Sequence, residues 1–460
     1  MLQHYKTSKI PHSMKVPYRP TEQNPSFNVS GKTMGGGPDS QHLFGIRADV
    51  LIPGRGEPIP NGGIVISVSE GVILWVGPYD DLPSKYNKVA FTKHVAVMPG
   101  LWDVHTHFMG ANVVADVNDS MKTFMPGTEF QVGAVTVDDL RATLMAGFTS
   151  VRELGGMAGY LQSMIDKGAI LGPTVYSALS VLSVTGGHGD QHDCPLSLCR
   201  GNSDGSNGLA LCDGVDECIK MTRSVIRNGA KVIKVCSTGG VLSLNDQPED
   251  TQFSPAELEA IVQEAARSGR VVASHAIGKP GILNALHAGV RTIEHGMYLD
   301  KEVADLMKEK GAILVPTRHI VESLSAGAED LPPILLKKLH RITQLSRDSF
   351  KLAVAEGVRI ALGTDTLSSD RKNALAHGRN AKELHWMKVA GMTPLQAIEA
   401  ATATPPETLG RQGPNAGQLK EGFDADIIVV CKNPLDDIDV LTDPSNITHV
   451  WKGGKLFKST

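Results

Sequence analysis

The chain has 460 residues, of which 41% are hydrophobic and 20% are charged, and its formal net charge is −4. These values are ordinary for a soluble globular protein, and the length suggests one large domain accompanied by a smaller one. The weakly acidic balance argues against nucleic acid or an anionic membrane as a partner, and no apolar stretch is long enough to span a bilayer.

Residues 1–42 are rich in Pro, Ser, Gly, Asn and Lys and carry few large apolar side chains. Such a segment cannot bury enough surface to offset its ordering entropy, so we expect a mobile tail. It has neither the apolar core of a secretory signal nor a clear Arg-rich amphipathic pattern. We therefore expect a cytoplasmic location, with secretion by another route left open.

Two strand-rich segments stand at opposite ends of the chain, at residues 43–97 and 416–460. Each contains a predicted hairpin with glycine at the turn, at residues 64–76 and 447–457. We expect the two segments to combine into one small β-sandwich domain.

Residues 98–415 alternate between helix and strand patterns. Apolar residues at a spacing of three and four predict helices at 137–146, 215–227, 255–268, 302–310 and 335–356. Each is followed closely by a glycine suited to a helix C-cap and then by a short apolar run. Together with residues 97–108, strands are predicted at 148–151, 174–178, 232–235, 271–273, 290–293, 313–315 and 358–362.

Eight such repeated units close most naturally as an α/β fold of the (β/α)8 TIM barrel type. An open, doubly wound parallel sheet is the alternative. It is less favoured because the chain lacks the G-x-G-x-x-G turn that often opens such folds.

The first predicted strand of this barrel, residues 97–108, reads VMPGLWDVHTHF. Side chains at i and i+2 of a strand point to the same face, so His105 and His107 project together while Thr106 points away. Two imidazoles held in this way form half of a metal site. Taken alone, a His-x-His pair is more often two unrelated polar residues.

Other polar residues stand at or near the C-terminal ends of the predicted strands, where barrel enzymes carry their function. They are Lys234, His275, His295 and Asp365. Each has a structural alternative: a core histidine, a lysine that reaches out of the barrel, or a helix N-cap. Four histidines and a carboxylate together, however, are typical of an open zinc site.

Lys234 needs a separate account, because its ammonium would repel a metal ion. Reaction with carbon dioxide would turn it into a carbamate, which is anionic and has two oxygens. Carbamylated Lys234 could then bridge two metal ions.

Several of these stretches match a known family. They are PGLWDVHTH at 99–107, GAKVIK at 229–234, His275, EH at 294–295, GTD at 363–365, ADII at 425–428 and THVWKGG at 448–454. Over roughly residues 45–458 the chain resembles the amidohydrolase superfamily of the binuclear type. VTGGHGD at 184–190, STGGV at 237–241 and PTR at 316–318 are similar to its subgroup of ochratoxinase-like amidases, carboxypeptidases and prolidases.

The resemblance implies two Zn²⁺ ions per subunit. One is held by His105, His107 and Asp365, the other by His275 and His295, and carboxylated Lys234 and a hydroxide bridge them. It implies that the hydroxide attacks an amide next to a C-terminal amino acid, as in ochratoxin A or a carboxypeptidase or prolidase substrate. Asp365 would serve as general base and then as general acid.

Three further residues follow predicted strands three, six and seven: His188, Tyr298 and Arg318. They could bind the substrate carboxylate or the oxyanion, and the alternative for each is a structural loop residue. The expected partner is thus a small-molecule or peptide amide with a free carboxylate. The resemblance also implies a homo-oligomer, with an octamer as in ochratoxinase one possibility.

Two stretches depart from the family pattern. Relatives often carry His-x-His-Gly after strand five, whereas Ile277 stands in place of the second histidine here, which leaves the substrate preference open. Residues 191–211 form a stretch peculiar to this chain. Cysteines from 194 to 218 could bind zinc or form a disulfide, but their spacing fits no usual zinc pattern, so reduced thiols are favoured.

Three other functions remain alternatives. A mononuclear deaminase would share the histidines and the aspartate but would not need Lys234. A lactonase or phosphotriesterase could use the same metals. A non-catalytic assembly protein is disfavoured because every ligand position is filled.

Overall fold

The computed structural model describes residues 42–111, 127–201, 205, 208–327 and 331–460. The predicted tail, residues 1–42, therefore lies outside the described residues except for His42. Within the described part, no helix has both the length and the apolar character needed to cross a membrane.

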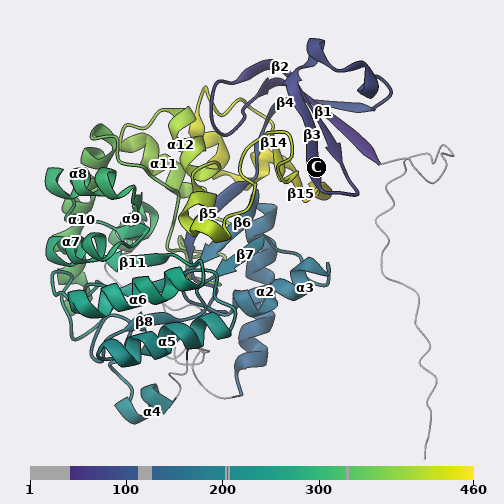
Figure 1. Cartoon of the computed structure of the whole chain (residues 1–460). Helices are drawn as coiled ribbons and strands as arrows, with labels where there is room; N and C mark the ends of the chain where they lie inside the picture. The colour runs from purple at the N-terminus through teal and green to yellow at the C-terminus, as the bar shows by residue number, and fades with distance from the viewer. Residues whose placement is uncertain (1–41, 112–126, 202–204, 206–207, 328–330) are drawn as a thin grey trace, which may run out of the picture. The chain divides into compact units, whose positions relative to one another are not determined.

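Strands from both ends of the chain share one seven-stranded sheet, in the order β16-β15-β14-β4-β1-β2-β3 (Figure 1). Their bounds are Leu43–Leu51 for β1, Ile59–Ser67 for β2, Val72–Pro78 for β3, Phe91–Pro99 for β4, Ile427–Val430 for β14, Ile447–Lys452 for β15 and Lys455–Ser459 for β16. β4 pairs in parallel with β1 and antiparallel with β14, with Met98 opposite Ile428. The sequence predicts a two-sheet sandwich; the structure instead links all seven strands in one sheet, because β4 and β14 hydrogen-bond directly.

The middle of the chain forms two parallel sheets. Strands β5 (Leu101–Thr106), β6 (Phe148–Glu153) and β7 (Thr174–Ser177) make the first. The second has the order β13-β12-β11-β10-β8-β9, with bounds Ile313–Val315, Thr292–His295, Val272–Ala276, Ile233–Cys236, Val181–Ser183 and Leu209–Leu211. Every residue of β5, β6, β10, β11 and β12 is buried, as expected for parallel strands covered on both faces.

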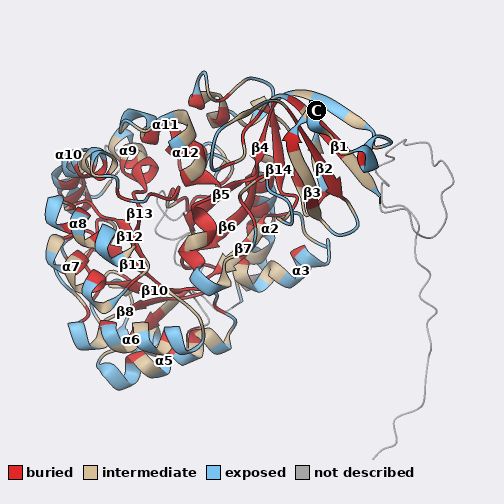
Figure 2. Ribbon diagram, turned by 45° about the horizontal axis from the view of Figure 1, so that its top comes forward, coloured by how far each residue is buried: buried red, intermediate tan, exposed pale blue. Residues whose placement is uncertain are grey.

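Helices alternate with these strands and carry most of the exposed surface, as Figure 2 shows for α5 and α6. The principal ones are α2 (Glu129–Met145), α5 (Val215–Arg227), α6 (Pro255–Arg267), α7 (Lys279–Ala288), α8 (Lys301–Lys310), α9 (Arg318–Ala326), α10 (Pro333–Ala355), α11 (Lys382–Val389) and α12 (Pro394–Ala401). The five predicted helices overlap α2, α5, α6, α8 and α10. The fold is therefore mixed α/β with alternating elements.

The predicted strand at residues 358–362 is not a regular strand, yet its backbone bonds to a neighbour on each side. Leu314 in β13 donates its N–H to Arg359, and Val104 in β5 donates to Leu362. On the other side, Lys231 donates to Ser177 at the end of β7. The bonds to Arg359 and Leu362 connect the edge strands β13 and β5 of the two parallel sheets, and the bond from Lys231 connects the edge strand β7 to the segment before β10.

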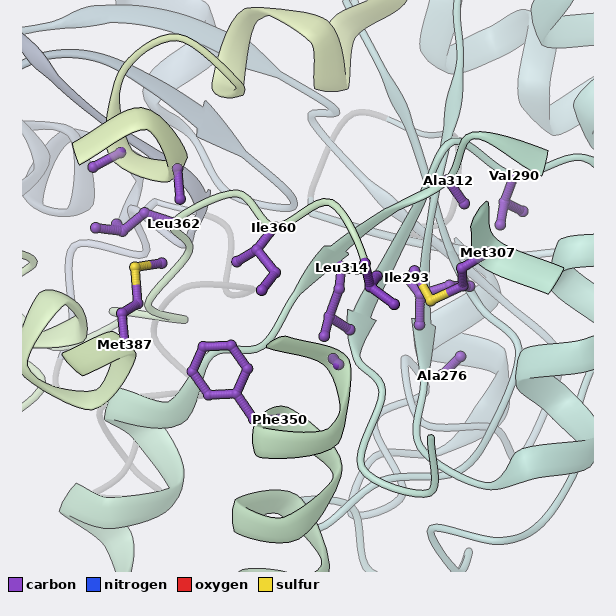
Figure 3. Packing of buried hydrophobic residues seen from close by; sticks show 14 of the residues in the cluster. Ala276, Val290, Ile293, Met307, Ala312, Leu314, Phe350, Ile360, Leu362 and Met387 are labelled. Carbon is purple, nitrogen blue, oxygen red and sulfur yellow. The ribbon is translucent and has the colours of Figure 1, made fainter. Parts of the chain in front are cut away.

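An apolar core fills the space between strands and helices. Figure 3 shows Leu314, Ile360 and Leu362 packing with Phe350 of α10 and Met387 of α11. These residues are buried, and this packing supports the segment that leads to Asp365.

Candidate metal centre

The two histidines of the His-x-His pair and Asp365 meet at the ends of their strands. The Nε2 atoms of His105 and His107 lie 3.5 Å and 3.2 Å from Oδ1 of Asp365. One ligand atom from each of the three residues falls within 4.8 Å of the others. This spacing suits a shared metal ion, and Thr106 points away and donates to the carbonyl of Arg152.

The remaining predicted ligands line the same cavity, which has a volume of about 410 Å³. The ring of His295 lies 5.1 Å from that of His105 and 4.6 Å from that of His275, measured between centroids. Lys234 also lines this cavity. The structure thus brings together all six residues predicted to hold metal.

Hydrogen bonds to carbonyls set the tautomers of two of the imidazoles. His107 contacts the carbonyl of Gly155 through Nδ1 at 2.8 Å, and His275 contacts the carbonyl of Gly239 through Nε2 at 3.0 Å. A carbonyl oxygen only accepts, so those nitrogens carry the hydrogen. The lone pair is therefore on Nε2 of His107 and on Nδ1 of His275, and each is available to a metal.

His105 is oriented by a carboxylate. Its Nδ1 donates to Oε2 of Glu294 at 2.9 Å, and Oε1 of Glu294 accepts from Arg152 at 2.8 Å. All three side chains are buried. The pairing leaves Nε2 of His105 free to face Asp365.

Burial favours the neutral form of His105, His275 and His295. It lowers the pKa of His105, His275 and His295 well below the usual range, and positive charge on neighbouring side chains lowers it further. Neutral imidazoles are the form that binds metal. For Asp365, burial raises the pKa, but the interactions with His105, His107 and Lys234 lower it by more, so its net pKa lies below the usual range of a carboxyl group and the side chain is ionised.

Backbone strain is concentrated at the same place. His295, Thr317 and Asp365 have φ values of 71°, 46° and 59°, in the left-handed region that non-glycine residues seldom adopt. Thr317 contacts Nδ1 of His295 through its hydroxyl at 2.7 Å. Strain of this kind persists where the surroundings over-determine a residue, as they do at functional sites.

Lys234 is buried among the predicted metal ligands. Its side chain is 3% exposed, and no hydrogen bond or ion pair reaches its terminal nitrogen from the residues that the structure describes. Burial lowers its pKa, which increases the fraction of neutral amine. The neutral amine is the form that could react with carbon dioxide to give the predicted carbamate.

The three predicted substrate-binding residues are placed differently from one another. His188 lines the cavity and stacks on His275 with ring centroids 4.2 Å apart. Tyr298 lies outside the lining and donates to Glu249. The sequence places Arg318 at the mouth because it follows strand seven; in the structure it begins α9 and its side chain is buried.

The guanidinium of Arg318 is already occupied. It bonds to the hydroxyl of Ser346 and pairs with Glu322, one turn along α9. Arg318 is 2% exposed and does not line the cavity. It is therefore not positioned to bind a substrate carboxylate, and its contacts are those of a structural ion pair.

Much of the cavity wall is apolar. Ile277, the residue at the departure from the family pattern, lines it together with Met297, Ile320, Leu324, Leu339 and Ile342. Four of these six residues come from α9 and α10. Their role in the wall was not recognised from the sequence, because helix periodicity does not say which apolar face meets a cavity.

Asp103 is a further supporting residue that sequence reasoning missed. Its carboxylate accepts from the backbone N–H of Thr364 at 3.1 Å and from Asn380 at 2.7 Å. The bond to Thr364 fixes the segment that ends in Asp365, and the bond to Asn380 ties the same carboxylate to the residues before α11. Strand alternation puts Asp103 on the face of His105, and that signal could have identified it.

No disulfide joins the cysteines, and one of them, Cys236, lines the cavity. All six are free thiols, and the sulfurs of Cys212 and Cys218 lie 3.5 Å apart, further than a disulfide bond allows. The stretch at 191–211 is described only in part and contains a short helix, α4 (Leu196–Gly201), and β9.

The chain is similar to several known hydrolases. Ochratoxinase from Aspergillus niger is 42% identical over 426 residues, which cover 90% of this chain and 86% of that protein. Its crystal structure matches with a TM-score of 0.83 over 91% of this chain and 96% of that one. A prolidase complexed with N-methylphosphonate-L-proline is 30% identical, with a TM-score of 0.80 over 91% of this chain and all of that one.

A Xaa-Pro dipeptidase with bound methionine is also 30% identical, with a TM-score of 0.77 over 91% of this chain and all of that one. The model of the amidohydrolase family matches residues 96–457, a range that includes all six residues gathered at the cavity. The chain therefore belongs to the amidohydrolase family, whose members are metal-dependent hydrolases.

Proposed function

We propose that this protein is a zinc-dependent hydrolase that cleaves an amide bond to a C-terminal amino acid. The observation that carries the proposal is the convergence of four imidazoles, one ionised carboxylate and one buried, unpaired lysine on a single cavity. The similarity to an ochratoxinase and to a prolidase supports amides of this kind as substrates, including ochratoxin A and short peptides.

The proposal includes the architecture that positions the site. Residues 98–415 form a closed (β/α)8 barrel, with residues 358–362 as its eighth strand. Residues 43–97 and 416–460 form the smaller domain. Backbone hydrogen bonds on both sides of residues 359–362 support closure, and closure would explain why the ligands gather at one end.

In this proposal His105, His107 and Asp365 would hold one metal ion, His275 and His295 would hold the other, and carbamylated Lys234 would supply an anionic ligand to both. When bound, two such ions lower the pKa of water and polarise a carbonyl group. Asp365 accepts the proton of the attacking water and passes it to the leaving nitrogen. His188 contacts the substrate, and the apolar wall excludes water and takes up an apolar group.

A substrate panel tests the proposal. It contains ochratoxin A, N-acyl amino acids, Xaa-Pro dipeptides and their C-terminally amidated analogues, with a lactone and a phosphotriester as the competing classes. We expect turnover of the amides with a free carboxylate, loss of turnover after chelation and recovery with zinc. Preference for the lactone or the phosphotriester, or full activity without metal, would contradict it.

We further propose that the protein is a homo-oligomer, because the seven-stranded sheet ends in two edge strands, β3 and β16, that a second copy could cover. Light scattering at micromolar concentration tests this, and a monomer would contradict it.

A further inference from the structure

The imidazole of His188 is packed closely by two neighbours. One face stacks on His275 with centroids 4.2 Å apart. Gly240 also lies against the ring, where an added Cβ would come within 2.1 Å of it. These contacts restrict the ring, but they do not decide which nitrogen faces the cavity.

Ser243 decides that question. Its hydroxyl oxygen lies 2.9 Å from Nδ1 of His188 and also contacts Oδ1 of Asp246. A carboxylate only accepts, so the serine donates its hydrogen to Asp246 and its oxygen accepts Nδ1–H from the imidazole. Nε2 of His188 then carries the lone pair, and it makes no hydrogen bond with any residue that the structure describes.

A buried lysine completes the arrangement. Lys338 of α10 is 2% exposed, and its ammonium lies 3.2 Å from Oδ1 of Asp246, 3.1 Å from the carbonyl of Gly240 and 2.7 Å from that of Ser243. All three of its donors are satisfied, as a buried ion pair requires. Neither Lys338 nor Asp246 has a role in the reaction proposed above.

We propose that Ser243 is a positioning residue that holds His188 as the Nδ1–H tautomer, with Nε2 facing the cavity as a hydrogen-bond acceptor. The carboxylate of Asp246 accepts the hydrogen bond that orients Ser243, and Lys338 balances the charge of this carboxylate through the ion pair. An acceptor at this place suits an N–H or O–H group of the substrate, whereas a carboxylate there would require the imidazolium. The nature of the reaction rests on the proposed function, but the arrangement of the four side chains does not.

Ser243→Ala is the variant to test, because it removes the hydroxyl and leaves the ion pair of Asp246 with Lys338 intact. We expect kcat/KM to fall about tenfold, the upper range for one neutral hydrogen bond, with the metal content unchanged. Ser349→Ala is the matched control: that buried serine of α10 bonds to the carbonyl of Ser346 and lies outside the cavity lining.

A double-mutant cycle separates positioning from a general structural effect. If Ser243 acts through His188, adding Ser243→Ala to His188→Ala costs less than a further twofold in kcat/KM. A full tenfold loss in both backgrounds would show that Ser243 acts independently and would overturn the proposal. Should Ser243→Ala not fold, Ser243→Cys, whose thiol is a weak hydrogen-bond partner, carries the same expectations.

A crystal structure of the metal-loaded Ser243→Ala protein gives a readout that does not depend on activity. We expect the His188 ring to rotate or to occupy more than one orientation while residues 239–246 keep their path. A ring fixed in its original place would contradict the proposal. If the wild-type protein hydrolysed nothing in the panel, the proposed function would fail, and the crystal structure would still decide the role of Ser243.

Discussion

Nδ1 of His105 and Oε2 of Glu294 are 2.9 Å apart, although 189 residues separate them in the chain. The carboxylate accepts the hydrogen of the imidazole on one side and pairs with Arg152 on the other. His105 at the end of β5, a proposed metal ligand, is therefore oriented by a residue of β12, the strand that also supplies His295.

Replacing Glu294 with glutamine should weaken metal binding without removing a ligand. If the amide oxygen keeps its bond to Arg152, the amide nitrogen faces Nδ1 of His105 and cannot accept its hydrogen. We expect zinc affinity to fall about 10- to 100-fold. Competition with a chromogenic chelator measures it, and Glu309→Gln, at an exposed position of α8, is the control. Unchanged affinity would show that Glu294 does not orient His105.

The second prediction concerns the proposed bridge. Lys234→Ala should lose most of the activity and at least one of two metal ions, because no other anionic group could replace a carbamate. Short carboxylic acids in the medium should restore part of the activity by occupying the same place. Lys231→Ala is the control, since Lys231 is exposed before β10, and it should keep both metals. Metal analysis that found two ions in Lys234→Ala would favour a mononuclear mechanism.

The third prediction concerns the buried Arg318. Arg318→Ala leaves Glu322 without its buried partner, so we expect the free energy of unfolding to fall by about 3 kcal/mol. The ratio of activity on free and amidated substrates should not change. Arg347→Ala removes a partner of the same Glu322, but its side chain is 44% exposed, so a loss below about 1 kcal/mol is expected. A selective loss on free carboxylates in Arg318→Ala would restore a role in substrate binding.

The fourth prediction is a pH dependence of stability. Burial, only partly offset by a hydrogen bond to the carbonyl of Ala374, lowers the pKa of His319 to about 4. Between about pH 6.5 and pH 4 the unfolded chain takes up a proton at this residue and the folded chain does not. His319 therefore stabilises the fold above about pH 6.5, and this contribution is lost as the pH falls, by at most about 1.4 kcal/mol per pH unit.

Urea unfolding of the metal-free protein at several pH values measures this effect without a contribution from metal release. His319→Gln should reduce the loss of stability between pH 6.5 and pH 5, whereas His340→Gln, at an exposed position of α10, should follow the wild type. Identical pH slopes for His319→Gln and wild type would contradict the assignment.

The alternation of elements and the convergence of the six proposed ligands on one cavity could be predicted from the sequence, since both depend on local patterns. Apolar runs mark the buried strands, and the polar residues at their ends stand out against them. Arg318 was misplaced because a strand end gives the position of the backbone, not the direction of the next side chain. Its partner Glu322 lies one turn along α9, and that pairing draws the guanidinium away from the cavity.

The arrangement around His188 was not predictable for a different reason. Ser243 and Asp246 lie in an irregular loop, whereas Lys338 lies in α10. No periodicity in the sequence therefore connects the three residues. Lys338 even interrupts the apolar face of α10. Only the folded structure brings these residues to the same hydrogen-bonded group.

The position of β4 between β1 and β14 also has a consequence for synthesis of the protein. β14 is made about 330 residues after β4, which at ordinary translation rates takes roughly 15 to 65 s. Throughout that time β4 has a partner on one edge only, and the open edge includes the apolar residues Ala96, Val97 and Met98. The nascent chain must keep this edge away from other chains on the polysome until Ile427–Val430 leaves the ribosome.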